Sequence, residues 1–371
     1  MQLPEVPEKA VAVIVPIYNR LDLLRATIES LRAQTLDNAE FILVDDRSEG
    51  EVWEYLSSLP AEDRRFRVFR KPDSLPRGCQ ASRNIGLDAT TARSVVFLDS
   101  DDLMAPRCLE ERHALLDRAG GTDIVVGRQA LFSAAGIRWI NLPLHGVANL
   151  DRFLDMAGRI DVPWINGGAL IRTSALREHS IRWRLEYHWD DVAFHFECLL
   201  ARMRVHWMDH VGTPDSWYRS HNDDRYGAVL SSSDGIRNAA RMFTWMRDSL
   251  HSRGMLTAAR TRALSRTFFH FCVVQPIDQG NASLASELIA QAEGDTLVSI
   301  ADARRMRAYR SVRLTNKVSS RLSAAADRFA RETWVKDLVS ASPSTFCTVA
   351  PDAPDAEASL QSIIAAESEM A

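Results

Sequence analysis

Three aspartates stand directly after an apolar run of the sequence. The run at 94–98 reads SVVFL, and Asp99, Asp101 and Asp102 follow it. Two like charges about 4 Å apart repel by about 4 kcal/mol at an effective dielectric constant of about 20, so the folded chain needs something that offsets this cost. Carboxylate oxygens are the ligands that hard divalent cations prefer. The cluster therefore predicts a cation site at the end of a buried strand.

Two further pairs of acids occupy comparable positions. Asp45 and Asp46 follow the apolar run FILV, and Asp190 and Asp191 open a predicted helix. Each pair has a structural alternative, because aspartates commonly cap turns and helices and the helix dipole favours acids in a first turn. That alternative is weaker for the three acids at 99–102, since a cap needs a single carboxylate.

The segments around these acids alternate between strand and helix patterns. VAVIVPI at 11–17 is a continuous apolar run typical of a strand buried on both faces, and an apolar stripe at helical spacing follows at 21–31. Strand patterns recur at 41–46, 66–70, 94–99 and 123–127. This alternation predicts an α/β fold with a mostly parallel, doubly wound sheet. Ligands of such sheets bind beyond the carboxyl ends of the strands, where these acids lie.

The pattern changes along the chain and predicts three parts. The strand–helix alternation and a less regular region rich in tryptophan occupy 1–230, and helical patterns with short breaks occupy 231–338. An acidic stretch rich in Ser, Pro and Ala occupies 339–371. We predict a catalytic domain, a helical C-terminal domain and a mostly disordered tail over these three ranges.

The overall composition is that of a globular protein. The 371 residues are 46% hydrophobic and 25% charged, with a net charge of −4, and no apolar run reaches the roughly 18 residues of a membrane helix. MQLPEVPEKA at the start lacks the basic and apolar regions of a secretory signal. The five cysteines are scattered and never form a C-x-x-C pair, which argues against disulfides or a zinc site. We expect a cytoplasmic protein that binds no nucleic acid.

A basic stretch lies within the predicted helical domain. Residues 301–337 hold ten Lys or Arg against four acids. One interpretation is a solvated helix face; the other is a surface for an anionic acceptor or for the inner face of a membrane. Acceptor recognition, homo-oligomer assembly, or both are the roles that the sequence leaves open for this domain.

The sequence resembles the family 2 glycosyltransferases, which are inverting enzymes with the GT-A fold. The resemblance covers about residues 10–220 and rests on VIVPIYNRLDLLRATIESLRAQT, FILVDDRS, CQASRNIGLDATTARSVVFLDSDDLM, and WINGGALIRTSAL with YHWDDVAFHFECLLA. It implies a nucleotide-sugar-binding domain that moves a sugar from a nucleotide sugar to a glycan or glycoconjugate hydroxyl, as in polysaccharide biosynthesis. UDP is the expected nucleotide. The resemblance says little about the helices after 230.

The resemblance also implies a nucleotide site. Asp46, with Asp45 beside it, would accept a hydrogen bond from the base, and Arg83 would lie near the nucleotide or the sugar. The other residues assigned to the nucleotide pocket are Pro16, Tyr18 and Asn19.

The family's metal site and catalytic base also have counterparts here. Asp99 and Asp101 form the family's DxD motif, with Asp99 toward the ribose. Asp101 and Asp102 would face Mn²⁺ or Mg²⁺, and which of them binds the ion directly stays open. Asp191 aligns with the catalytic base. Two further residues are placed at the donor site, namely Asp190, where Glu is commoner in the family, and His221, which lies where some members contact the diphosphate or the metal.

The expected chemistry suits these residue types. A metal ion and cations neutralise the charge that develops on a diphosphate leaving group, and a carboxylate on the opposite face of the sugar removes the acceptor proton. We predict one in-line displacement with inversion at the anomeric carbon.

The sequence argues against two other functions. A catalytically silent sugar-nucleotide-binding or scaffold protein is disfavoured by the presence of all four acids, Asp99, Asp101, Asp102 and Asp191. A nucleotidyltransferase usually needs an early glycine-rich phosphate loop, and VPIYNRLDL contains no glycine. The identity of the sugar and of the acceptor does not follow from the sequence.

Overall fold

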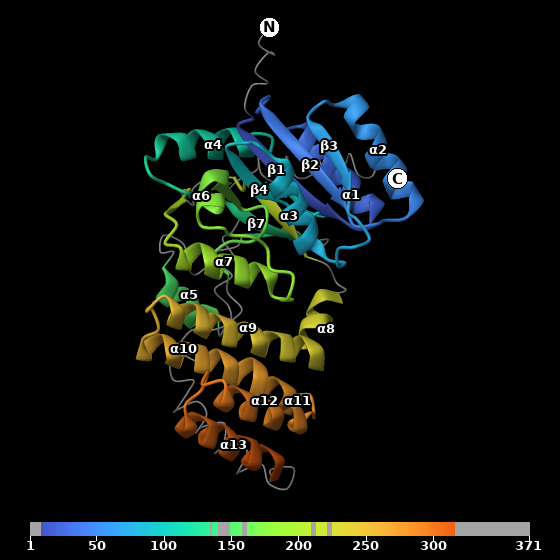
Figure 1. The fold of residues 1–371 in the computed structure, drawn as a ribbon. Coiled ribbons are helices and arrows are strands. Elements are labelled where there is room, and N and C mark those ends of the chain that lie inside the picture. The colour runs from blue at the N-terminus through green and yellow to red at the C-terminus, as the bar shows by residue number, and fades with distance from the viewer. Residues whose placement is uncertain are drawn as a thin grey trace.

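The computed structural model describes residues 9–133, 136–139, 149–157, 162–208, 213–220 and 225–315. It confirms the predicted fold class, because a mixed α/β unit with a mostly parallel central sheet is followed by α-helices (Figure 1). His221, the predicted tail and the basic residues after 315 lie outside the described residues.

The main sheet has seven strands in the order β10-β6-β9-β4-β1-β2-β3. β1 pairs in parallel with β2 and β4, and β2 pairs in parallel with β3. β9 runs antiparallel to both β4 and β6, which the sequence patterns did not predict. The strands are β1 Val11–Ile17, β2 Ala39–Asp45, β3 Phe66–Arg70, β4 Ser94–Phe97, β6 Ile124–Val126, β9 Ala169–Arg172 and β10 Val205–Trp207.

A second, four-stranded sheet lies beside the acidic segment, in the order β5-β11-β7-β8. β5 directly follows the three acids and pairs antiparallel with β11, so the two strands bring distant parts of the chain together. The strands are β5 Leu103–Met104, β7 Gln129–Ser133, β8 Gly136–Trp139 and β11 Ser216–Arg219.

Helices cover both faces of the main sheet because alternate residues of its central strands point to opposite faces. Val13 and Val15 pack in one cluster with α1, α2 and α4, whereas Ala12 and Ile14 pack in another with α3, α6 and α7. α3 approaches β1 so closely that a Cβ on Gly86 would lie 2.3 Å from the Ile14 side chain. The helices of this domain are α1 Leu21–Arg32, α2 Gly50–Glu62, α3 Cys79–Ala89, α4 Cys108–Arg118, α5 Leu150–Ala157, α6 Thr173–Glu178 and α7 Asp190–Leu200.

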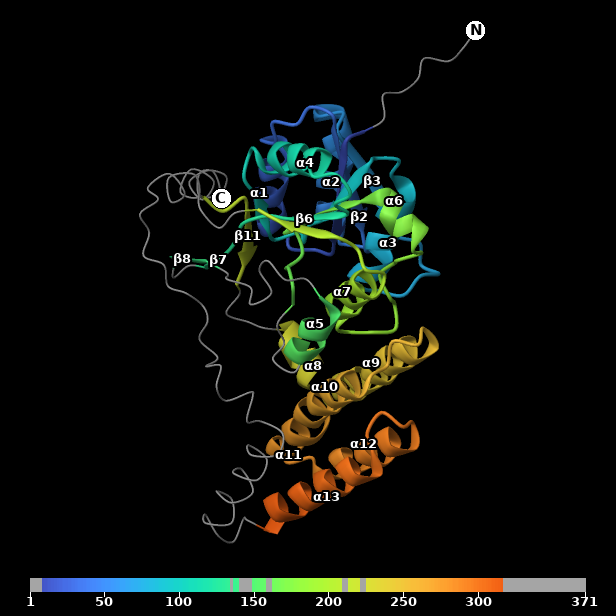
Figure 2. The same cartoon turned by 90° about the vertical axis from the view of Figure 1, so that its left-hand side faces the viewer.

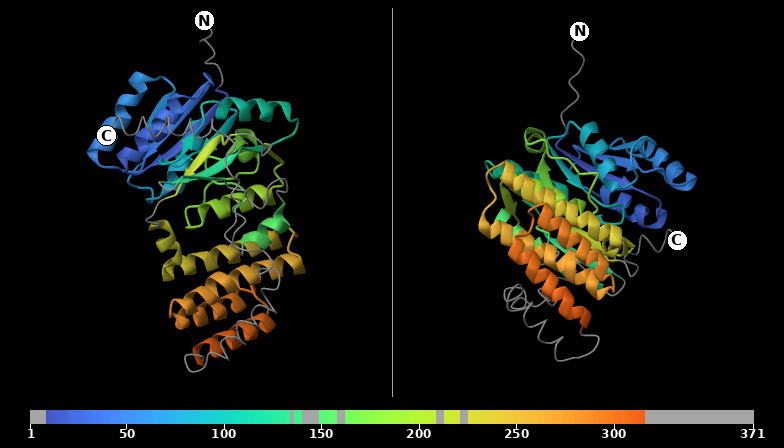
Figure 3. Two further views of the ribbon diagram at one scale, coloured as in Figure 1. Left: turned by 180° about the vertical axis from the view of Figure 1, so that it is seen from behind. Right: turned by 60° about the horizontal axis from the view of Figure 1, so that its bottom comes forward.

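The C-terminal helices stack beyond α7, which lies between the sheet and α9 in Figures 1 and 2. Figure 3 shows the same stack from behind and from below. Val192 and Phe196 of α7 share a hydrophobic cluster with Phe243 and Phe271 of the stack. The elements are α8 Arg225–Ser231, α9 Ser233–Ser252, α10 Ala258–Phe268, the π-helix η1 Phe269–Val274, α11 Gln275–Asp278, α12 Ala282–Gly294 and α13 Ile300–Thr315. Over the described residues, none of the helices has the length and apolar character that crossing a membrane requires.

Candidate active site

Those predicted site residues that the structure describes gather around the carboxyl ends of β1, β2 and β4. β4, β1 and β2 pair in parallel, so the loops after their carboxyl ends lie side by side. These loops carry Asp99, Tyr18 and Asp46. The start of α7 reaches the same edge, because a single side chain, Arg83, contacts both Asp99 and Asp190.

The three acids after β4 are offset by positive groups of the chain itself. Asp99 Oδ1 lies 2.6 Å from Arg83 Nη2, and Asp101 Oδ2 lies 2.9 Å from Arg20 Nη1. The Arg219 side chain on β11 donates to the Asp101 carbonyl across 2.9 Å. Three arginines from separate parts of the chain therefore reduce the repulsion within this cluster.

Asp102 is the most buried of the three acids, with 1% of its surface exposed. Its Oδ1 accepts a 2.9 Å hydrogen bond from the backbone N–H of Arg219. Its Oδ2 is also buried and has no hydrogen-bond partner. Burial, with Asp99 and Asp101 close by, raises the pKa of Asp102 well above its usual range. An orphaned buried carboxylate oxygen of this kind is costly unless a cation reaches it.

A divalent cation fits this corner. Across the residues that the structure describes, no three His, Cys, Asp or Glu side chains converge as a complete metal site. Mg²⁺ and its analogues, however, usually bind through one or two carboxylates and take their other ligands from substrate phosphates and water. The orphaned oxygen of Asp102 and the adjacent Asp101 carboxylate form such a partial donor set.

Arg83 joins the acidic loop to α7. Its side chain is 3% exposed and bridges Asp99 and Asp190, with both N–O distances at 2.6 Å. The guanidinium also lies over the Trp183 ring, 4.1 Å from the ring centroid. α3 supplies this residue from the predicted A-S-R-N segment. The sequence placed Arg83 near the donor; the structure places it in the polar layer between the two groups of acids.

Asp190 and Asp191, which open α7, have different surroundings. Asp190 is buried and accepts hydrogen bonds from Arg83 and from the Cys79 thiol at 3.3 Å. Asp191 stays partly exposed, and its Oδ1 accepts a 2.7 Å bond from the Val192 N–H. Desolvation among its neighbours and the charge of Asp190 raise the pKa of Asp191 to about 6. This carboxyl group is therefore suited to accept a proton near neutral pH.

Asp45 and Asp46 differ in their surroundings. Asp45 is fully buried and accepts from the Ser48 N–H at 3.1 Å, so its carboxylate closes the turn after β2. Asp46 lies nearer the surface, and its Oδ2 contacts Lys71 Nζ at 2.6 Å and the Gly78 N–H at 2.8 Å. Asp46 is thus the member of the pair at the edge of the site, fixed by a buried lysine.

The loop after β1 presents an exposed aromatic ring. Pro16 is buried within β1, whereas Tyr18 is 52% exposed and Arg77 lies over its ring at 5.2 Å. Asn19 has a left-handed backbone with φ of 54°, and its N–H donates to Ser48 Oγ at 2.9 Å. The loops after β1 and β2 are therefore tied together beside Asp46.

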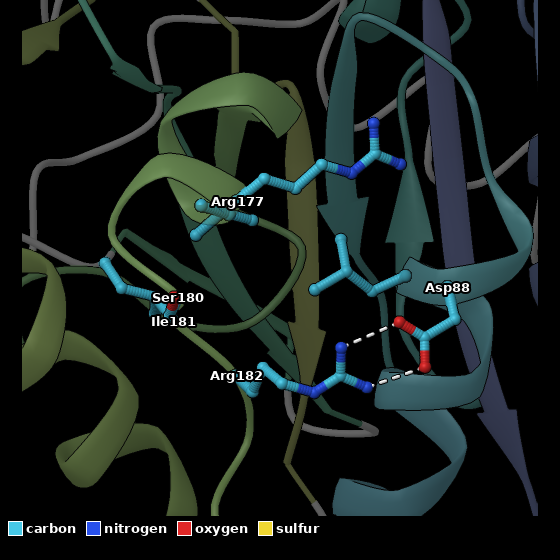
Figure 4. A pocket seen from close by; sticks show the side chains of 7 residues that line it. Asp88, Arg177, Ser180, Ile181 and Arg182 are labelled. Atoms are coloured by element: carbon cyan, nitrogen blue, oxygen red, sulfur yellow. Dashed lines mark hydrogen bonds and ion pairs between the residues drawn. The ribbon is translucent and has the colours of Figure 1, made fainter.

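A surface pocket of about 280 Å³ lies elsewhere, between the end of α3 and α6 (Figure 4). Its wall includes Asp88 and Arg182, which form a two-point ion pair with both N–O distances at 2.7 Å. None of its lining residues belongs to the acidic site described above.

Sequence reasoning missed several cations of the site. Arg20 pairs with Asp101, and Lys71 pairs with Asp46. Arg219 donates from its side chain to the Asp101 carbonyl and from its backbone N–H to Asp102. Lys71 follows the end of β3, so the rule that ligands bind beyond parallel strand ends could have found it. Arg219 comes from β11, whose pairing with β5 had no local signal in the sequence.

A doubly wound sheet with this acidic edge defines a GT-A-type fold. The family model "Glycosyl transferase family 2" matches residues 12–179. Residues 12–179 thus carry the pattern of family 2 of the glycosyltransferases, the family that the motifs of the sequence resemble.

Individual proteins agree with this assignment. The chain is 28% identical over 219 residues to the succinoglycan biosynthesis protein ExoW of Rhizobium meliloti, and the match covers 54% of this chain and 66% of ExoW. The chain spans less than two thirds of the length of several other curated relatives. The crystal structure of S. aureus TarS 1–349 in complex with UDP-GlcNAc has a TM-score of 0.61 at 18% identity and covers 82% of this chain and 88% of its own.

A second solved structure holds a metal. The mannosyltransferase PcManGT from Pyrobaculum calidifontis, in complex with GDP-Man and Mn²⁺, has a TM-score of 0.50 at 14% identity. The alignment covers 98% of this chain and 88% of that chain. At these identities both structures establish the fold.

Proposed function

We propose that the protein is a metal-dependent, inverting glycosyltransferase that moves a sugar from a UDP-sugar to a hydroxyl of a glycan or glycoconjugate. The observation that carries this proposal is the Arg83 bridge, which brings the acids after β4 and the first turn of α7 to one place. The family assignment of residues 12–179 supports sugar transfer. TarS, solved with UDP-GlcNAc, supports a UDP-sugar as donor.

Asp191 is the proposed general base. As the acceptor oxygen bonds to the anomeric carbon, the bond from that carbon to the diphosphate oxygen breaks and its electron pair leaves with UDP. The acceptor proton passes to the Asp191 carboxylate. A pKa of about 6 keeps most of this group ionised at neutral pH and still makes it a better proton acceptor than an ordinary aspartate.

The leaving group departs toward the acidic corner. Asp101 and Asp102 are the proposed ligands of Mn²⁺ or Mg²⁺, which when bound neutralises charge on the diphosphate. Arg20 is 41% exposed and pairs with Asp101, so its guanidinium is within reach of the same region. We assign Arg20 to the diphosphate as a second positive group.

The nucleotide is proposed to lie across the loops after β1 and β2. The exposed ring of Tyr18 offers a face for the base, and Asp46 offers an acceptor for a base N–H. Asn19 ties these two loops together, while Asp45 closes the turn after β2 by accepting from the Ser48 N–H.

The proposed acceptor is a growing polysaccharide or related glycoconjugate, which the similarity to a succinoglycan biosynthesis protein supports. We propose residues 1–230 as the catalytic domain and 231–338 as a helical domain. Action in the cytoplasm at the inner face of the membrane, and assembly into homo-oligomers through the helical domain, remain predictions.

The test is UDP release from UDP-GlcNAc and UDP-glucose in the presence of Mn²⁺. Asp191→Asn is expected to lower kcat by about a hundredfold or more, while the Kd of UDP stays close to wild type. Asp88→Asn, in the surface pair with Arg182, is the control and should keep full turnover. An active Asp191→Asn variant contradicts the base. UDP binding without turnover of any UDP- or GDP-sugar favours the silent binding protein instead.

A further inference from the structure

The segment at 183–189 leads directly into α7 and therefore determines where the first turn of this helix lies. Its beginning is fixed by α3. Asn84 Nδ2 donates to the Trp183 carbonyl at 2.7 Å, and Asn84 Oδ1 accepts from the Trp183 N–H at 3.0 Å. α7 begins at Asp190, so any displacement of the end of this segment displaces Asp191 with it.

The end of the same segment is held by the C-terminal helices. Asn238 on α9 donates from Nδ2 to the Glu186 carbonyl at 2.6 Å and accepts at Oδ1 from the His188 N–H at 2.8 Å. Both hydrogen-bonding groups of this one amide are therefore used on the backbone that precedes Asp190.

Asn238 lies on α9 among buried apolar side chains. Asn238 is 2% exposed, and its neighbours Ile236, Ala239 and Met242 are buried hydrophobic residues. A buried amide is costly when its groups are unpaired, and asparagine is a weak helix former. The two hydrogen bonds to the backbone of Glu186 and His188 satisfy this buried amide and explain why an asparagine occupies the position.

Aromatic contacts reinforce the same junction. The Trp189 ring meets Phe271 of η1 edge-on, with centroids 4.8 Å apart, and the Tyr187 ring lies 5.2 Å from Trp245 of α9. Two residues of the segment are thus packed on two elements of the C-terminal stack. The stack, which lies beyond the residues that match the family, is in contact with the segment that precedes the base.

We propose that Asn238 is a positioning residue for Asp191, so that the C-terminal helices complete the active site rather than act as a separate module. This inference rests on the proposed function, in which Asp191 is the base. Asn238 acts by holding the backbone of Glu186 and His188; it does not touch the substrate.

The experiment compares two asparagines of the helical stack in the full-length protein. Asn238→Leu removes both bonds to the segment. Asn281→Ala is the control, because Asn281 caps α12 by accepting from the Leu284 N–H at 3.1 Å and lies outside the contacts with the segment. The probe is UDP-GlcNAc with Mn²⁺, and kcat, KM and Tm are measured for each variant.

We expect Asn238→Leu to lower kcat by about ten- to hundredfold, since small misplacements of a catalytic group have effects of this size. The KM for UDP-GlcNAc should stay within about twofold, because the donor loops are untouched. Asn281→Ala should lower Tm and leave kcat near wild type. A wild-type kcat in Asn238→Leu overturns the proposal, as does an equal loss of kcat in both variants.

Hydrogen exchange supplies a readout that does not depend on turnover. The His188 amide donates to Asn238, so peptides covering 184–190 should exchange faster in Asn238→Leu than in the wild-type protein. In Asn281→Ala their exchange rate should equal that of the wild-type protein. Unchanged exchange in Asn238→Leu overturns the proposal. A wild-type rate in Asp191→Asn, by contrast, shows that the assignment of Asp191 as base in the proposed function has failed, and this outcome is distinct from unchanged exchange in Asn238→Leu.

Discussion

Arg83 donates a hydrogen bond to Asp190 across 2.6 Å, which joins α3 to the first turn of α7. The second Arg83 nitrogen bonds to Asp99 at the same distance. Because the arginine is 3% exposed, water contributes little to balancing these charges. Arg83 therefore ties the acidic loop directly to the helix that carries the proposed base.

Replacing Arg83 should strongly destabilise the fold. Arg83→Met leaves two carboxylates without their shared partner, and we expect the free energy of unfolding to fall by about 3–5 kcal/mol. Arg182→Met breaks the surface pair with Asp88 and should cost about 1 kcal/mol or less. Urea denaturation measures both. An equal, small loss in the two variants would show that the Arg83 bridge contributes little.

The pH dependence of turnover should report Asp191. The pKa of this group is raised to about 6 by desolvation and by Asp190, with Arg83 and Asp99 as the other charged groups nearby. The carboxylate, which is the active form of a base, is present above this pH and is lost as the pH falls. We expect kcat/KM to rise between about pH 5 and pH 7 and then level off, provided that Asp191 is the limiting group. A rise centred near pH 4, where an ordinary aspartate titrates, would contradict this assignment.

Replacing Asp102 should stabilise the fold and weaken metal binding. Asp102→Asn removes a buried charge beside Asp99 and Asp101 but keeps an acceptor for the Arg219 N–H. In the presence of EDTA we expect the variant to be more stable by about 1 kcal/mol. Calorimetry should show that the enhancement of UDP binding by Mn²⁺ is lost. Wild-type enhancement would exclude Asp102 from the metal site.

Lys71 should affect the affinity for UDP, because it holds the Asp46 carboxylate in place. The lysine side chain is fully buried, and its Nζ bonds to Asp46 and to the Gly78 carbonyl. Lys71→Met removes one of the partners of Asp46 Oδ2 and leaves the carboxylate with the Gly78 N–H and Arg47. We expect this looser attachment to raise the Kd of UDP by about tenfold, which corresponds to about 1.4 kcal/mol. Unchanged UDP affinity in a folded variant would argue against base recognition by Asp46.

The basic face of α13 gives a further prediction. Arg305 pairs with Asp302, Arg307 with Glu293 and Arg313 with Asp278, all within the helical stack. These contacts favour the solvated-face interpretation over an anionic binding surface. We expect the triple change of Arg304, Arg305 and Arg307 to Ala to leave sedimentation with vesicles rich in phosphatidylserine unchanged. A loss of salt-dependent sedimentation in the triple variant would favour the membrane interpretation.

Much of the fold could be predicted because its central strands are buried on both faces. The runs at 11–17 and 41–44 are continuously apolar, and the helical stripe between them has unambiguous periodicity. The antiparallel strand β9 and the small sheet could not be predicted. Their strands have two to five residues, and pairings such as β5 with β11 depend on the path of the chain between them.

The candidate site could be predicted in part for a similar reason. Acids at strand ends form a local pattern, so Asp46, Asp99 and Asp102 were found from the sequence. Their partners are distant in sequence: Lys71 is 25 positions from Asp46, and Arg219 is 117 from Asp102. Asn238 carries no local signal, because an isolated asparagine within a helical pattern does not indicate what its side chain will bind.

A crystal structure of the protein with UDP and Mn²⁺ would test the central claim most directly. The account predicts a manganese peak between the diphosphate and the carboxylates of Asp101 and Asp102, with the uracil beside Tyr18 and Asp46. Anomalous scattering would identify the ion. A nucleotide bound in this position with no manganese at the two aspartates, or bound at another part of the fold, would contradict the account.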